Sequence, residues 1–322
     1  MKKIRKLIAL CCCVVLVMCS SVIISAQSVD DESFSQYTVV TKSYETDKVT
    51  SRVVIPQSTL SAVEYENQVT PARMPSTKAY EVLGIKDENS IDTTSTRIVN
   101  RMEVDENQYP YCAIGRVESK WMVSDTEMLI IKGTGCLEGP DVVLTCAHII
   151  YHDEYGWSEE TWFYPGQTSD TVAGRPIQSQ AINISIARSF IDAHKDDWAI
   201  MRVEDDLGYL GWFGKGVATS TLIGTKMVSS GYRAGVSGRQ IKTSGTVQRL
   251  AQDYDSWVMH LSGIDGNDGC SGGPIYHEDN RIVRGIYNFG GGYYDGGGRA
   301  IDSWLYNMLQ EAYLEGVEKW GY

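Results

Sequence analysis

The chain has 322 residues and a formal net charge of −12 at neutral pH. An acidic surface repels phosphate backbones, which excludes nucleic acid as a partner. The eight cysteines include no Cys-x-x-Cys pair and no other metal-ligand spacing, so the sequence predicts neither a metal site nor a cofactor.

The N-terminus has the pattern of a secretory signal peptide. Four basic residues among the first six positions precede an apolar run, Leu7–Ile24, and the small pair Ser25–Ala26 then offers a cleavage site. Residues 1–26 are therefore predicted to be a signal peptide, whose loss removes four positive charges and changes the net charge from −12 to −16. The alternative is a retained membrane anchor, since the run approaches the length that spans a bilayer.

A polar stretch, residues 27–95, follows the predicted signal peptide. It is rich in Ser, Thr, Val and Glu and contains neither cysteine nor tryptophan. We interpret it as a pro-segment, and a flexible spacer fits the composition almost as well.

From residue 96 onward, short apolar runs alternate with turn signals, which predicts an all-β fold without parallel βαβ units. One helix is expected at the C-terminal end, where Asp302 is placed to cap it and apolar residues recur at helical spacing from Trp304 to Ala312. The pattern alone does not distinguish two barrels from a sandwich. The predicted strands are Ala113–Val117, Glu127–Ile131, Val142–Thr145, Ala181–Ala187, Trp198–Val203, Lys226–Ser230, Gly245–Leu250, Trp257–Leu261 and Ile282–Tyr287.

Three motifs in this region carry residue types suited to nucleophilic catalysis. Val142–His148 is an apolar strand that ends in small residues and a histidine, and in Asp196–Arg202 an acid precedes another apolar strand. In Asp268–His277, glycines surround a serine as Gly-x-Ser-Gly-Gly-Pro. A serine nucleophile needs a base to take its proton and an acid to orient that base. Taken singly, the histidine would be a packed or surface residue and the aspartate a turn residue.

Together the three motifs resemble those of the chymotrypsin-like serine peptidases, and within them the bacterial glutamyl endopeptidase group. Tyr109–Ile114 and Gly285–Gly291 support the narrower match, and the resemblance covers roughly residues 96–318. It implies a trypsin-like fold of two antiparallel six-stranded β-barrels. The first barrel is expected over residues 96–205, and the second, with the C-terminal helix, over residues 206–322.

The resemblance also assigns catalytic roles. His148 is expected to be the general base, Asp197 to orient its imidazole, and Ser271 to be the nucleophile. The backbone N–H groups of Gly269 and Ser271 are expected to form the oxyanion hole, because side chains at the neighbouring glycines would block the substrate carbonyl.

The expected substrate pocket contains Asp265, Tyr287 and Gly290. Asp265 stands six residues before Ser271, the spacing at which trypsins carry the acid that binds Arg or Lys, although a longer loop would instead leave it solvated. Glutamyl endopeptidases carry a histidine where this chain has Tyr287, so the acid-binding imidazole is missing. Gly290 begins a glycine-rich loop, residues 290–298, which we place beside the pocket or, alternatively, on the surface as a mobile loop.

Four cysteines remain after the predicted signal peptide: Cys112, Cys136, Cys146 and Cys270. Cys136 and Cys146 flank a turn, which allows a disulfide between them. That bridge would differ from the usual one of the resembled family, whose second cysteine comes just after the histidine, where this chain has Ile149.

An activating protease is a further expected partner, since the resemblance places removal of the pro-segment near Asn89–Ile91. A cut before Ile98, as in animal trypsins, would lack the acid that receives the new N-terminus, because Cys270 occupies that position.

These expectations describe a secreted, extracellular serine endopeptidase. It would hydrolyse protein or peptide substrates through an acyl-enzyme, with no stable membrane association after signal cleavage. Two alternatives stay open. One is a peptidase fold that has lost catalysis and serves as a binding module or adhesin, and the other is a protein tethered by its N-terminal apolar run.

Overall fold

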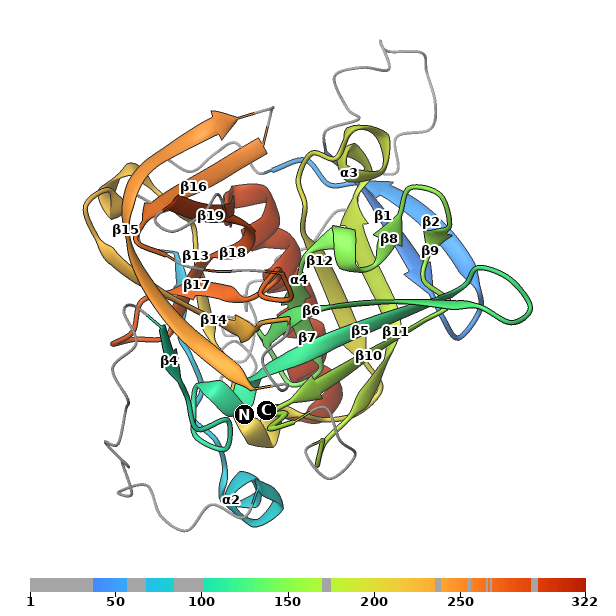
Figure 1. The fold of residues 1–322 in the computed structure, drawn as a ribbon, viewed down its shortest axis with the longest axis horizontal. Coiled ribbons are helices and arrows are strands. Elements are labelled where there is room, and N and C mark those ends of the chain that lie inside the picture. The colour runs from blue at the N-terminus through green and yellow to red at the C-terminus, as the bar shows by residue number, and fades with distance from the viewer. Residues whose placement is uncertain are drawn as a thin grey trace, which may run out of the picture. The chain divides into compact units, whose positions relative to one another are not determined.

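Two closed β-barrels form the body of the protein in the computed structural model (Figure 1). This confirms the predicted all-β fold of two six-stranded antiparallel barrels with a C-terminal helix. The fold is therefore a pair of barrels and not a sandwich. The structure describes residues 37–56, 68–83, 101–169, 175–234, 239–253, 256–264, 266, 268–290 and 295–322. The predicted signal peptide and the cleavage positions near residues 89–91 and 98 lie outside these residues.

The first barrel is built from strands between Ile114 and Val203. They are β5 (Ile114–Met122), β6 (Met128–Leu137), β7 (Val142–Thr145), β10 (Glu160–Pro165), β11 (Ser179–Ala187) and β12 (Ala199–Val203). The order around the ring is β10-β5-β6-β7-β12-β11, and pairing of β10 with β11 closes it. Three further short elements belong to this half: α3 (Arg188–Ala193) and the small hairpin of β8 (Tyr151–His152) and β9 (Gly156–Trp157).

The second barrel repeats this plan between Lys226 and Ala300. Its strands are β14 (Lys226–Tyr232), β15 (Gln240–Asp253), β16 (Ser256–Ser262), β17 (Pro274–Tyr276), β18 (Ile282–Gly290) and β19 (Asp295–Ala300). The order is β17-β14-β15-β16-β19-β18, and β17 pairs with β18 to close the ring. Short 3-10 helices lie at Tyr111–Ala113 (η2), Ala147–Ile149 (η3), Gly208–Leu210 (η5) and Ser220–Leu222 (η6).

Alternating burial makes some of these strands visible in the sequence, and others, such as β7, are continuous apolar runs that are buried throughout. Along β15, Ile241, Thr243, Gly245 and Val247 are buried while the residues between them are partly exposed. Strand β19 has no such alternation, since its sequence is Asp-Gly-Gly-Gly-Arg-Ala, and it was not predicted. Glycine is required there because a Cβ at Gly298 would overlap the carbonyl group of Ile286 on the paired strand.

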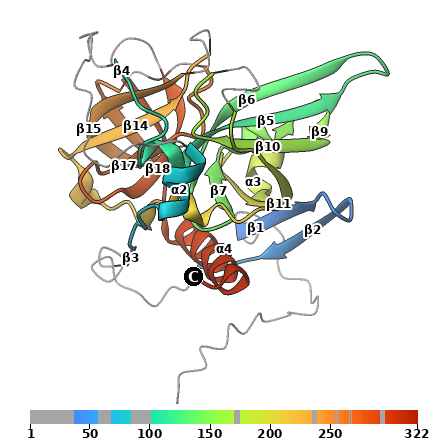
Figure 2. The same ribbon diagram turned by 90° about the horizontal axis from the view of Figure 1, so that it is seen from below.

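The C-terminal helix α4 (Ser303–Trp320) packs against β7 and β12 of the first barrel (Figure 2). Asp302 caps it as predicted, and its carboxylate accepts a hydrogen bond of 2.8 Å from the backbone N–H of Leu305. The apolar face predicted from helical spacing is buried from Trp304 to Leu309 and partly buried at Ala312. The ring of Trp304 lies edge-on to Trp198 with centroids 5.3 Å apart.

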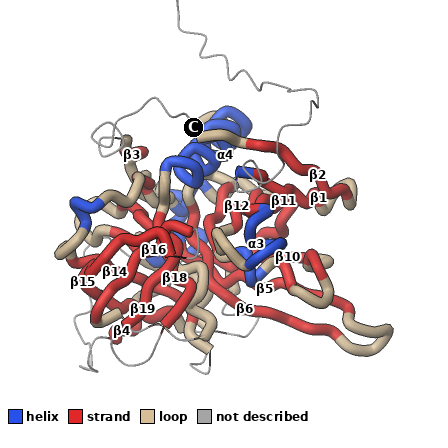
Figure 3. Tube along the Cα trace, turned by 90° about the horizontal axis from the view of Figure 1, so that it is seen from above, coloured by secondary structure: helices blue, strands red, loops and turns tan. Residues whose placement is uncertain are grey.

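Residues before the barrels also form regular elements. Strands β1 (Thr38–Ser43) and β2 (Lys48–Val53) make a hairpin that pairs with β11, and α2 (Thr77–Leu83) follows further along the chain. Strand β3 (Val69–Thr70) pairs with β13 (Gly214–Gly216), which itself pairs with β18. Strand β4 (Arg101–Glu103), in the range expected for the first barrel, instead pairs with β15 of the second. Figure 3 shows the hairpin and β3 on either side of α4.

No disulfide joins Cys112, Cys136, Cys146 and Cys270, all of which are buried. The bridge that the sequence allowed between Cys136 and Cys146 is therefore not formed. The physical reason is register: Cys136 lies opposite Leu144 across the β6–β7 pair, and the thiol of Cys146 donates instead to the carbonyl of Tyr287, 3.5 Å away. Among the helices that the structure describes, none combines the length and the apolarity needed to cross a bilayer.

A buried ion cluster around Arg299 joins the two barrels and α4. Arg299 on β19 has a side chain only 1% exposed, and its guanidinium lies 2.9 Å from the carboxylate of Asp196 and 2.6 Å from that of Asp302. Asp196 belongs to the loop between α3 and β12 and also accepts hydrogen bonds from Ser189 and Ser256. One guanidinium thus holds a loop of the first barrel, a strand of the second and the cap of the helix.

We predict that Arg299→Met destabilises the protein by about 3–5 kcal/mol, because the buried carboxylate of Asp196 and the partly buried carboxylate of Asp302 lose their positive partner. Urea unfolding followed by tryptophan fluorescence measures the change. Arg249→Met is the matched control, since Arg249 pairs with Asp253 at the surface with a side chain 55% exposed, and it should cost less than about 1 kcal/mol. Equal losses for the two variants would contradict a joining role for Arg299.

Candidate active site

The imidazole of His148 lies at the edge of the first barrel on a firmly anchored backbone. Strand β7 ends at Thr145, and η3 then turns the chain so that Ala147 and Ile149 are buried on either side of His148. The histidine side chain itself remains 39% exposed. Its position is therefore fixed by the barrel while its ring can reach a substrate.

Asp197 lies two residues before the start of β12 and accepts two hydrogen bonds from His148. Its Oδ2 lies 2.7 Å from His148 Nδ1, and its Oδ1 accepts the backbone N–H of His148 at 3.0 Å. The side-chain amide of Asn288 on β18 also donates to Oδ2, at 3.4 Å. Because an ionised carboxylate can only accept a hydrogen bond, Nδ1 of His148 must carry the proton. In a neutral ring Nε2 is then unprotonated and can accept a proton.

The pairing moves the pKa values of both groups. Burial lowers the pKa of His148, but the charge and the hydrogen bond of Asp197 outweigh burial, so this pKa lies above its ordinary value. Burial raises the pKa of Asp197, and the charge of His148 with the hydrogen bonds from His148 and Ala147 brings it below its ordinary value. Asp197 is consequently ionised at neutral pH, and His148 is a stronger base than an isolated histidine.

Ser271 lies on the turn before β17, and the first barrel holds this turn in place. The backbone N–H of Thr134 on β6 donates to the carbonyl of Ser271 at 2.7 Å, and the Thr134 hydroxyl donates to the carbonyl of Gly269 at 2.7 Å. From the second barrel, Gly272 donates its N–H to the carbonyl of Tyr287 at 2.7 Å. The turn is thus hydrogen-bonded to both barrels.

Two glycines give the turn its shape and bring it against the segment that carries His148. Gly269 and Gly272 have φ values of +88° and +86°, which side-chain-bearing residues rarely adopt. A Cβ at Gly272 would also overlap Thr134 and Thr145 and lie 3.2 Å from the backbone nitrogen of Cys146. The turn therefore packs on residues 145–146, just before His148. Within the part of the chain that the structure describes, the Ser271 hydroxyl makes no hydrogen bond.

The N–H groups of Gly269 and Ser271 are available as donors. Neither of them donates to an acceptor among the described residues, whereas the next two N–H groups in the turn, those of Gly272 and Gly273, donate to the carbonyls of Tyr287 and Cys270. Two N–H groups on one tight turn can bind a developing negative charge on a substrate oxygen.

Of the predicted pocket residues, Tyr287 and Gly290 lie together. Tyr287 is 2% exposed, and a Cβ at either Gly266 or Gly290 would overlap its ring, so the ring fills the space between these two backbones. Its own backbone is held by Gly273, whose carbonyl accepts the Tyr287 N–H at 2.8 Å. Asp265 and residues 291–294 of the glycine-rich loop lie outside the described residues.

The motifs did not reveal three of the groups that build this site: Thr134, Asn288 and the thiol of Cys146. Asn288 is a polar residue within the apolar strand β18, which is the signal that could have marked it. Donor atoms of Cys146, His148 and Asp197 lie within 4.8 Å of one another, as metal ligands do. Burial and the charge of Asp197 raise the pKa of the Cys146 thiol well above its ordinary value, so the thiol is neutral. His148 and Asp197 are hydrogen-bonded to each other, so the three residues do not form an open set of metal ligands.

Comparisons of the sequence with known proteins agree with this geometry. The model of a trypsin-like peptidase domain matches residues 133–286, which include His148, Asp197 and Ser271. The glutamyl endopeptidase of Bacillus licheniformis is 26% identical over 185 residues, which cover 57% of this chain. The match spans about half, 52%, of the length of that relative.

Solved structures show the same fold. A Glu endopeptidase superimposes with a TM-score of 0.55 at 20% identity, over 67% of this chain and 98% of the other. The protease Anisep from Arthrobacter nicotinovorans gives a TM-score of 0.54 at 15% identity, over 66% of this chain and 99% of the other. The two barrels, the matched trypsin-like peptidase domain and the glutamyl endopeptidase relative together support a chymotrypsin-like serine peptidase related to the glutamyl endopeptidase (V8-like) group.

Proposed function

We propose that this protein is a secreted serine endopeptidase that hydrolyses peptide bonds through His148, Asp197 and Ser271. The observation that carries the proposal is the contact of 2.7 Å between His148 Nδ1 and Asp197, made directly beside the turn that holds Ser271. The proposed substrates are proteins and peptides, the substrates on which peptidases of this family act.

The proposed reaction runs in two halves. Nε2 of His148 takes the proton of the Ser271 hydroxyl while Oγ attacks the carbonyl carbon, and the N–H groups of Gly269 and Ser271 bind the oxyanion. His148 then gives the proton to the leaving amine, the peptide bond breaks, and an acyl-enzyme remains on Ser271. Water, deprotonated by His148, hydrolyses this ester and restores the hydroxyl. Asp197 keeps the ring in the required tautomer throughout.

Two features of the sequence and the structure bear on substrate choice. Tyr287 fills the space between Gly266 and Gly290 and offers no imidazole to a substrate carboxylate. We therefore propose that the chain lacks the strong glutamate preference of the relatives named for it, and that Asp265 favours basic side chains if it faces the pocket.

Secretion is the remaining part of the proposal. It rests on the basic and apolar pattern of residues 1–26. Cell fractionation distinguishes it from the tethered alternative, which would leave the full-length chain in the membrane fraction and none in the medium.

Ser271→Ala should lower kcat/KM on a peptide substrate by roughly 10⁴–10⁶-fold, because the variant has no hydroxyl to form the acyl-enzyme. A fluorophosphonate probe should label the wild type and Ser124→Ala, whose serine lies in the exposed β5–β6 turn, but not Ser271→Ala. Absence of labelling in wild-type protein with a processed N-terminus would instead support the catalytically silent binding module.

The rate should rise with pH through a midpoint above about 6.5, the ordinary pKa of histidine. His148 must be neutral to accept the serine proton, and its pKa is raised, so the neutral form appears at higher pH than in an isolated histidine. In Asp197→Asn the attraction disappears and burial remains, which should bring the His148 pKa below about 6.5. NMR titration of the His148 ring protons in both proteins measures whether the pKa is higher in the wild type than in Asp197→Asn. An unchanged pKa in the variant would contradict the prediction.

Tyr287→His should raise the ratio of kcat/KM for a glutamate peptide over the matched glutamine peptide by about 10-fold, because an imidazolium adds a charge-assisted hydrogen bond to the carboxylate. Tyr287→Phe should leave the ratio unchanged and serves as the control. A wild type that already prefers glutamate more than 10-fold would contradict the proposed role of Tyr287. An arginine peptide assayed with Asp265→Asn tests the basic preference in the same series.

A further inference from the structure

The described residues of the predicted pro-segment are bound to the peptidase body as an integral part of it. We call residues 37–56 and 68–83 the N-terminal arm. Five consecutive residues of its strand β1, from Val39 to Ser43, pair with β11 of the first barrel. Val39 and Val40 are 0% and 4% exposed, and Val39 belongs to the main hydrophobic core. The arm thus supplies apolar side chains that complete the core and covers an edge of β11.

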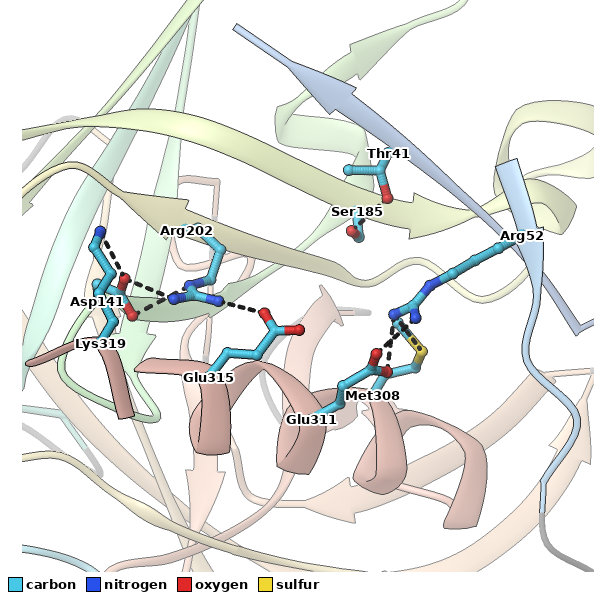
Figure 4. A network of polar contacts seen from close by, with 9 residues as sticks. All are labelled: Thr41, Arg52, Asp141, Ser185, Arg202, Met308, Glu311, Glu315 and Lys319. Carbon is cyan, nitrogen blue, oxygen red and sulfur yellow. Dashed lines mark hydrogen bonds and ion pairs between the residues drawn. The ribbon is translucent and has the colours of Figure 1, made fainter. Parts of the chain in front are cut away.

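Polar contacts fix the register of this hairpin. Thr41 Oγ1 lies 2.8 Å from Ser185 Oγ on β11, and Tyr44 Oη lies 2.7 Å from Ser158 Oγ. Figure 4 shows the Thr41–Ser185 pair and, beside it, Arg52 of β2 reaching Glu311 on α4. The two guanidinium contacts to Glu311 measure 2.6 and 2.8 Å, but both side chains are more than a third exposed, so this ion pair contributes little beside the buried valines.

The second half of the arm binds on the other side of α4. Thr70 on β3 is 8% exposed, and its hydroxyl lies 2.7 Å from the side chain of Gln310. Arg73 exchanges two backbone hydrogen bonds with Trp212, at 2.9 and 3.0 Å, and its guanidinium lies over the rings of Trp212 and Tyr322. Ala79 on α2 is fully buried. The arm therefore holds the first barrel, α4 and the connection between the barrels.

The body is shaped to receive the arm. A Cβ at Gly211 would overlap the carbonyl of Arg73, and a Cβ at Gly214 would overlap the carbonyl of Thr70. These two glycines leave room for the arm's backbone in a segment of the body more than 130 residues away along the sequence. A segment that was only a transient cover would not need such close backbone contact.

We propose that the N-terminal arm remains bound after the chain is cleaved between residues 83 and 101, so that the mature protein is a non-covalent complex of two chains. The arm's partner is the peptidase body itself, through β11, α4 and residues 209–216. None of these contacts involves residues 145–148, 197 or 269–273, which build the candidate active site. In this arrangement cleavage frees a new N-terminus on the body without releasing the arm, and the proposal does not depend on catalysis.

The test uses the full chain with Ser271→Ala, which prevents self-digestion, and a recognition sequence for a specific protease placed at residues 88–93. After complete cutting, gel filtration in native buffer with 1 M NaCl, followed by mass spectrometry of the fractions, shows whether the two fragments travel together. We expect them to elute together in equal amounts and to separate only in denaturing urea. Elution of the body alone in native buffer would overturn the proposal.

Two variants locate the interaction. Val39→Asp places a charge in the core, and after cutting it should reduce the arm recovered with the body at least 10-fold. Val49→Asp on β2, where the valine is 51% exposed, should retain the arm like the parent protein. Equal retention by both variants would show that the β1–β11 pairing does not hold the arm, which also contradicts the proposal.

Discussion

The ion pairs of the buried Arg299 guanidinium are the interactions on which the geometry of this protein depends most. Arg299 pairs with Asp196 in a loop of the first barrel and with Asp302 at the cap of α4, while its own backbone belongs to the second barrel. Asp196 adopts a left-handed backbone conformation, with φ +54°, immediately before Asp197. The orientation of the carboxylate that binds His148 is therefore coupled to the ion cluster behind it, in which Arg299 and Asp196 are buried.

The site also depends on the first barrel holding a turn of the second. Thr134 donates to the carbonyls of Ser271 and Gly269, and its hydroxyl accepts the N–H of Tyr232 on β14. Its own carbonyl accepts from Thr145, three residues before His148. One threonine thus links both halves of the site, and neither barrel alone would assemble it.

The sequence predicted those parts of the fold that have a local signal. Strand β7 was predicted with its observed bounds, and the cap at Asp302 and the apolar face of α4 were also correct, because each follows from spacing within a few residues. Strand β19 was not predictable, because its three glycines carry no alternation. The pairings of β1 with β11, β3 with β13 and β4 with β15 were not predictable either, because these partners lie far apart in the chain. Asn288 stands out as a polar residue in an apolar strand, but its role could not be inferred, because its partner Asp197 lies 91 residues earlier.

The contact between Arg52 and Glu311 spans 259 residues of sequence, and it has a consequence for the order of folding. Contacts between segments so distant form slowly, because closing a long loop costs chain entropy before any contact is gained. The hairpin β1–β2 is synthesised before β11, with which it pairs, and α4 is synthesised nearly last. The contact between the hairpin and α4 is therefore expected to form among the latest steps of folding, after most of the chain has been made.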